Sequence, residues 1–377
     1  SESHHGPWTQ GLVKRGPPSR TTMDQPWWKR PSILPLVLTA MTILIIVVGG
    51  TIRINDAGES CPDWPQCFGT WGFAVDEAEQ TAYWEEHPDQ VDSRGPDHRY
   101  SIFEIFVEWF HRMLVGIIAV PILLNVYVAN KKKKTYGEGL RNLAIVSAVF
   151  LVVQAIAGAV TVHFDNADWT VALHLSLASI FTSLLVWQYM AMRVTEGTNW
   201  KFIHTSKAFL DKQRKRFIGI TSSVFILLIL GAWVSSTAGG QYNQGCSIGF
   251  PNGWPQCQGK FFPSIDGPGI LVQMLHRFGA GIVGIILILS AARVRVDSRD
   301  FSEGEGFSKA AEAVTGLWIL NVFIGGMYIV FANANEFPES FSLLHLIFGV
   351  ASFIAAAITL MMLRIATLTQ SNLNEEE

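Results

Sequence analysis

Eight long apolar segments, separated by polar ones, dominate the hydropathy pattern of the chain. Each is close to the length of about 20 residues that a helix needs to cross the hydrocarbon core of a bilayer. In lipid the backbone must satisfy its own hydrogen bonds, which favours helices over irregular structure. We therefore predict an all-α integral membrane protein with eight transmembrane helices at residues 33–52, 106–129, 141–162, 170–192, 217–238, 270–292, 311–332 and 342–364.

Composition agrees with this prediction. The chain is 49% hydrophobic and only 16% charged, whereas soluble domains carry about a quarter charged residues. The distribution of Lys and Arg says more than the net charge of −3. Sixteen lie in the connections after the second, fourth and sixth predicted helices, and four lie after the odd-numbered ones. The positive-inside rule then predicts a multi-pass protein of the cell membrane with both termini in the cytoplasm.

Two halves of the chain repeat each other. Trp-Pro-Gln-Cys occurs at residues 64–67 and again at 254–257, and Leu-His-Leu occurs at 173–175 and 344–346. Because each half contains an even number of helices, both keep the same orientation, as in parallel repeats about an axis along the membrane normal. The prediction is two parallel-repeat four-helix bundles. The expected units are a disordered cytoplasmic tail (1–32, without the apolar core of a signal peptide), a first repeat (33–192), a basic cytoplasmic linker (193–216), a second repeat (217–364) and a cytoplasmic tail (365–377).

The predicted outer loop at residues 53–104 is long and acidic, with twelve Asp or Glu residues. Its composition is that of a solvated external cap, part of it irregular. A docking surface for a basic partner is the alternative. The pattern alone does not decide between them.

Four intramembrane histidines recur in equivalent places. The first half has His111 and His174, and the second half has His276 and His345. An isolated core histidine usually serves as a hydrogen-bonding group, but recurrence of two positions favours a ligand role. Each half would hold two histidines at one depth on two helices, which suits a haem iron clamped from both faces. Zinc would call for Cys or carboxylate ligands at that depth.

The residues next to these histidines differ in charge between the two halves at one position. Glu108 lies three positions before His111 and so shares its helix face, whereas the second half has Gln273 there. A carboxylate beside one haem could exchange protons or stabilise developing charge; pairing with Arg112 is the simpler reading. Arg112 and Arg277 follow the histidines directly and could bind haem propionates or reach the lipid headgroups.

The four cysteines form two close pairs in predicted outer loops, on the side where disulfides persist. We expect Cys61 to pair with Cys67 and Cys246 with Cys257. A structural clip over each bundle is the simpler interpretation. Thiol chemistry during turnover or maturation is the alternative.

Together these motifs resemble the haem A synthase family. The resemblance rests on Gly-Gly-Thr-Ile-Arg at 49–53, the Cys pair at 61 and 67 with Trp-Pro-Gln, and Glu-Trp-Phe-His-Arg at 108–112. It covers about residues 33–364. The long acidic insertion between Cys67 and Glu108 departs from the family pattern.

The resemblance implies an oxidoreductase acting on CH or CH2 groups, which converts the C8 methyl of haem O to a formyl group by successive hydroxylation. The product, haem A, serves cytochrome oxidase. The resemblance further implies a haem b cofactor on His276 and His345, substrate haem iron on His111 and His174, and an essential carboxylate at Glu108.

Other functions and partners follow from the same residues. A two-haem membrane cytochrome that only relays electrons is the alternative to an enzyme. A transporter is disfavoured because intramembrane charges do not line a continuous path. Expected partners are the lipid bilayer, haem O, the synthase that makes haem O, and an electron donor that the sequence does not identify. We expect no nucleic-acid partner, and the formation of a homo-oligomer stays open.

Overall fold

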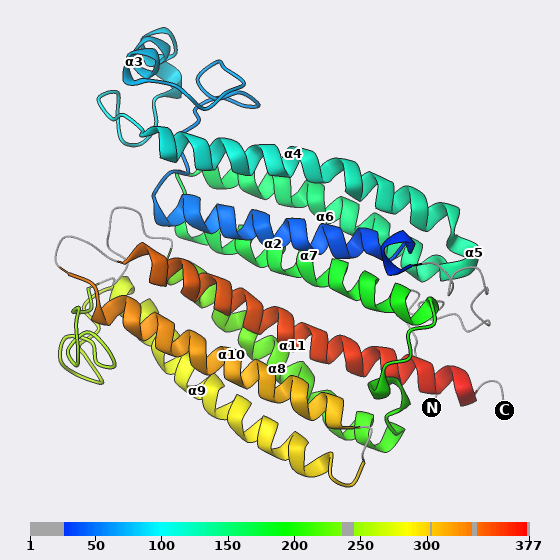
Figure 1. Ribbon diagram of the computed structural model, residues 1–377. Coiled ribbons are helices and arrows are strands. Elements are labelled where there is room, and N and C mark those ends of the chain that lie inside the picture. Colours follow the sequence, from blue (N-terminus) through cyan, green and yellow to red (C-terminus); the bar gives the residue numbers. More distant parts are fainter. Residues whose placement is uncertain (1–25, 236–244, 302–303, 334–337, 375–377) are drawn as a thin grey trace.

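The computed structural model describes residues 26–235, 245–301, 304–333 and 338–374 (Figure 1). Within these residues the fold is all-helical, with two isolated β-bridges and no strand. Eight helices are long and apolar enough to cross a membrane, which confirms the predicted class and number. They are α2 (Ile33–Ile54), α4 (Ile102–Lys131), α6 (Glu138–His163), α7 (Asp168–Thr195), α8 (Lys207–Ser235), α9 (Pro268–Asp297), α10 (Glu305–Val330) and α11 (Glu339–Asn374).

Several helices extend beyond their apolar runs because polar residues cap or continue them. α4 begins at Ile102 through a capping box, in which the Ser101 hydroxyl accepts from the Glu104 N–H and the Glu104 carboxylate accepts from the Ser101 N–H. α11 continues ten residues past the predicted end at 364, so most of the expected C-terminal tail is helical. Residues 375–377 lie outside the described residues.

The predicted N-terminal tail and the basic linker also need new boundaries. Residues 1–25 lie outside the described residues, but a 3-10 turn, η1 (Trp27–Lys29), precedes α2. Most of the predicted linker is helical, since α8 starts at Lys207 after the short η3 (Lys201–His204). Buried Glu196 holds this end together by accepting hydrogen bonds from Ser32 and from Tyr136 of α5 (Lys133–Tyr136).

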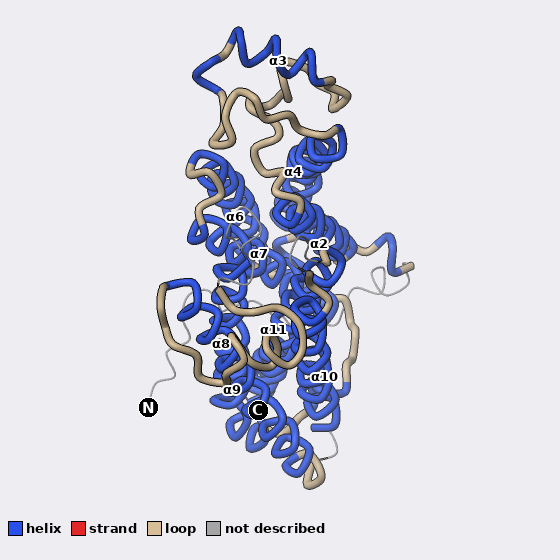
Figure 2. The backbone as a smooth tube through the Cα atoms, turned by 90° about the vertical axis from the view of Figure 1, so that its left-hand side faces the viewer, coloured by secondary structure: helices blue, strands red, loops and turns tan. Residues whose placement is uncertain are grey.

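The eight helices form two groups of four. α2 and α6 each contact both α4 and α7, and α8 and α10 each contact both α9 and α11. The groups meet where α2 and α7 pack against α8 and α11, around Ile46, Ala178 and Val350. Figure 2 shows the two groups from the end of the helices. The matching contacts are those that a parallel repeat would produce, and the repeat relationship itself stays a prediction.

The acidic outer loop folds into a small unit of its own. It contains α3 (Glu77–Glu86), started by a capping box between Asp76 and Glu79, and the short η2 (Pro88–Gln90). Trp84 and Tyr100 are buried in a cluster with the Cys61–Cys67 disulfide. The unit projects beyond the end of α4, opposite the basic connections after α4, α7 and α9 (Figure 1). This acidic loop is thus more regular than its composition indicates.

Candidate functional site

The four intramembrane histidines stand on diagonals of the two helix groups. α4 and α7 share the neighbours α2 and α6, and they carry His111 and His174. α9 and α11 share the neighbours α8 and α10, and they carry His276 and His345. The sequence places these pairs in equivalent positions, and the structure puts each pair across the centre of its group.

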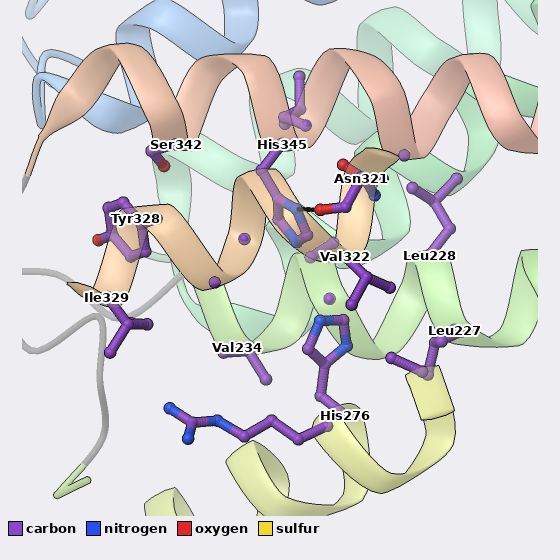
Figure 3. A pocket seen from close by; sticks show the side chains of 18 of the residues that line it. Leu227, Leu228, Val234, His276, Asn321, Val322, Tyr328, Ile329, Ser342 and His345 are labelled. Atoms are coloured by element: carbon purple, nitrogen blue, oxygen red, sulfur yellow. Dashed lines mark hydrogen bonds between the residues drawn. The ribbon is translucent and has the colours of Figure 1, made fainter. Parts of the chain in front are cut away.

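In the second group the two imidazoles face each other. Figure 3 shows the rings of His276 and His345 directed toward one another, and their centroids are 6.2 Å apart with an interplanar angle of 90°. An imidazole nitrogen binds a metal at about 2.0 Å, so two histidines that hold one metal must lie close together and face each other. The observed arrangement therefore fits two residues that would hold one haem iron.

A backbone carbonyl sets the tautomer of His345. Its Nδ1 lies 3.0 Å from the Asn321 carbonyl oxygen, as the dashed line in Figure 3 indicates. A carbonyl only accepts, so Nδ1 carries the proton and Nε2 keeps its lone pair for a metal. The Nδ1 atoms of His174 and His276 are buried and have no hydrogen-bond partner among the described residues. Such unpartnered ring nitrogens are costly in a sealed interior and suit a site that binds a group.

Each of the four histidine rings lies against a glycine of a neighbouring helix. A Cβ built on the glycine would come within about 3 Å of the ring, closer than ordinary contact allows. The close approach requires glycine, because any side chain would displace the imidazole. The distances from that Cβ to the ring Cε1 are 3.2 Å for Gly49–His111, 3.1 Å for Gly158–His174, 3.0 Å for Gly231–His276 and 2.6 Å for Gly325–His345.

The pattern of hydrophobicity did not reveal Gly49 and Gly231 as part of the site. A signal was nevertheless present, since Gly49 and Gly231 lie in equivalent helices α2 and α8 of the two halves. Their repetition acquires a meaning only when the helices are seen to flank the histidine diagonals.

The facing histidines line a cavity of about 270 Å³. Its walls are mostly apolar, with Leu227, Leu228 and Val322 near the imidazoles (Figure 3). The cavity also reaches residues of the other half, including Arg53 on α2. An apolar slot with two inward imidazoles has the donor set and the surroundings that a low-spin haem requires.

Glu108 connects α4 to the disulfide loop. It is only 4% exposed. One carboxylate oxygen accepts from the Ser60 hydroxyl and from the Cys61 N–H, each at 2.9 Å, and the other is 2.6 Å from an Arg112 nitrogen. The simpler interpretation of Glu108 as a partner of Arg112 is thus confirmed as a contact. Its predicted catalytic role stays a prediction.

The arginines after the histidines hold the outer loops against the helices. Arg112 donates to the carbonyls of Cys61, Asp63 and Gln66. Arg277 donates to the carbonyls of Gly253 and Gln256 at 2.6 and 2.7 Å and to the Gln273 side chain. These contacts give both guanidinium groups a structural function. Their predicted contact with haem propionates stays a prediction.

Both predicted disulfides are present, Cys61–Cys67 and Cys246–Cys257. After each second cysteine the chain makes the same turn, with two residues at positive φ: Phe68 and Gly69 in one loop, Gln258 and Gly259 in the other. Paired backbone hydrogen bonds close both turns, from Cys67 to Thr70 and from Cys257 to Lys260. Positive φ at both central positions is typical of a type I′ turn, so the sequence repeat is also a repeat of local structure.

Comparison with known proteins identifies the family of the chain. The family model described as "Cytochrome oxidase assembly protein" matches residues 32–358. A haem A synthase of Exiguobacterium sibiricum is 26% identical over 336 residues, which are 87% of this chain and 95% of that protein. One of Geobacillus thermodenitrificans is 25% identical, covering 84% and 88%, and one of Cereibacter sphaeroides is 27% identical, covering 67% and 70%. With its eight helices of membrane-spanning length, two loop disulfides and recurring histidines, the chain belongs to the haem A synthase family of cytochrome oxidase assembly proteins.

Proposed function

We propose that the protein is a haem A synthase that oxidises the C8 methyl of haem O to a formyl group by successive hydroxylation. The observation that supports this most is the unequal pair of sites. His276 and His345 face each other beside Gln273, whereas the half with His111 and His174 has the buried carboxylate of Glu108. A chain that only relays electrons has no evident use for a carboxylate at one site alone.

The second half fits a resident haem b, held by His276 and His345. That group supplies a one-electron redox centre when it is bound. The chain's own contribution is the perpendicular pair of imidazoles, the glycine faces of α8 and α10 that let the rings approach, and the mostly apolar wall of the cavity. The Asn321 carbonyl keeps the proton of His345 on Nδ1.

The first half would receive haem O, with its iron on His111 and His174. Glu108 lies one turn outward from His111 on α4, held by Ser60, Cys61 and Arg112. In this position it can keep a negative charge near the substrate edge, or accept a proton when Arg112 moves away. Haem O would come from the synthase that makes it, and a separate electron donor would act as the redox partner. The positive-inside pattern supports a cell-membrane location with both termini in the cytoplasm.

Exchange of the carboxylate for an amide tests the proposal. Glu108→Gln gives the first half the residue that the second half has, with almost no change in volume. We expect a host that supplies haem O to make haem A at least about 10²-fold more slowly with this variant, as for the loss of a general acid or base. Its bis-histidine haem spectrum should be unchanged. The matched control, Gln273→Glu, should retain conversion. Normal haem A production by Glu108→Gln, measured by chromatography of extracted haems, would refute the catalytic role.

A further inference from the structure

Arg53 of the first half lies on the wall of the cavity in the second half. It is at the outer end of α2, and Gly50 and Ile54 from the same helix also line this cavity. The packing of α2 against α11 explains the position, since a Cβ on Gly50 would lie 3.0 Å from the Leu346 side chain. The cavity of the second histidine pair is thus completed by the other repeat.

The guanidinium of Arg53 is incompletely paired. Its side chain is 11% exposed, and one terminal nitrogen, Nη1, is 3.6 Å from an Asp56 carboxylate oxygen. Asp56 also lies 3.4 Å from Arg94, so one carboxylate serves two cations. The Nε and Nη2 atoms of Arg53 are buried and have no hydrogen-bond partner among the described residues. Arg53 does not extend to the lipid headgroups, because such a side chain would expose its charge.

The geometry of these two nitrogens points to one class of ligand. Nε–H and Nη2–H lie on the same edge of the guanidinium and form a planar fork, which matches the two oxygens of a carboxylate. A buried cation with two unmet donors is expensive unless an anion pairs with it. The group that would share this cavity with His276 and His345 carries carboxylates on its rim.

We propose that Arg53 binds a propionate of the haem held by His276 and His345, so that a residue of one repeat anchors the haem of the other. This inference rests on the proposed function for the identity of the ligand. Gly49 contacts His111 as Gly231 contacts His276, so these two glycines occupy equivalent positions in the two halves. By the same alignment Arg53 is equivalent to Ser235. Arg53 therefore has no cationic counterpart, and the interaction serves only the second site.

Haem b and its dimethyl ester, in which both propionates are esterified, test the proposal. Both are titrated into haem-depleted full-length protein in detergent. Wild type should bind haem b about tenfold more tightly than the ester, as expected for hydrogen bonds between charged groups. Arg53→Ala should lose this preference, because its affinity for haem b falls while its affinity for the ester is unchanged. Arg53→Lys should keep part of the preference. Arg99→Ala is the control, because Arg99 pairs with Thr81 and does not line the cavity.

Each outcome decides one question. Equal affinity of wild type for the two haems, or equal loss of both in Arg53→Ala, would overturn the assignment of Arg53. Because the wild-type comparison needs no substitution, it holds even if a variant folds poorly. A His276→Ala protein that keeps full haem content would overturn the haem site itself. A preference for haem b in a protein that makes no haem A would leave Arg53 assigned and refute only the proposed reaction.

Discussion

We predict that Gly325→Ala removes most of the bound haem but leaves the protein folded. Gly325 belongs to α10, and a Cβ there would lie 2.6 Å from Cε1 and 2.8 Å from Nδ1 of the His345 ring. Ordinary van der Waals contact begins at 3.4 Å, so the ring must move by about 0.8 Å. The His345 ring also donates a hydrogen bond to the carbonyl of Asn321, which lies in α10 like Gly325. This hydrogen bond opposes the movement of the ring.

The substitution should affect protein stability much less than haem binding. Overpacking typically costs about 1–3 kcal/mol, and alanine in place of a helical glycine returns about 0.5–1 kcal/mol, so the net loss of stability is small. Ligand positions in metal sites are held within about 0.2 Å, and a displacement of about 0.8 Å exceeds this. We therefore expect a folded protein that has lost most of its bis-histidine haem.

The assay is the ratio of haem to protein after purification, with the absorption spectrum of the reduced protein. The control is Gly316→Ala in the same helix, where a Cβ meets nothing within 4 Å. It should keep its haem and match or exceed wild-type stability. Gly231→Ala, with 3.0 Å to the His276 ring, should have a weaker effect than Gly325→Ala. A Gly325→Ala protein with the wild-type haem ratio and spectrum would refute the reasoning.

Two further predictions concern the outer loop. Cys61→Ser removes the disulfide to Cys67 and should destabilise the loop by about 2–3 kcal/mol; faster limited proteolysis between residues 61 and 101 would show this, and an unchanged rate would contradict it. Burial raises the pKa of the Glu59 carboxyl above its ordinary value of 4.5, so the folded protein holds this proton more tightly than the unfolded chain. Stability should then fall as pH rises from about 4.5 through the raised pKa. Glu59→Gln should lack that part of the fall in thermal unfolding, and identical pH profiles for the two proteins would show that the group does not contribute.

The sequence was sufficient to determine the membrane class and the number of helices long enough to span a membrane. Length and hydropathy act within single segments, and lipid leaves the backbone almost no alternative to a helix. Repetition along the chain likewise identified the histidine pairs, the asymmetry between Glu108 and Gln273, and both cysteine pairs. Helix ends were less certain. Capping by Ser101 and the polar continuation of α11 lie outside the apolar runs on which the prediction depends.

Only the tertiary structure decided which residues meet across helices. Contact between helices depends on their rotation and relative depth, which hydropathy does not encode. The tertiary structure therefore revealed that Gly231 packs against the His276 ring. It also revealed that Arg112 donates hydrogen bonds to the carbonyls of Cys61 and Asp63 in the loop. It also placed Arg53 of the first half in the cavity of the second. The sequence specifies the repeated scaffold because that signal is local, whereas the junction between the repeats arises from packing between residues far apart in the chain.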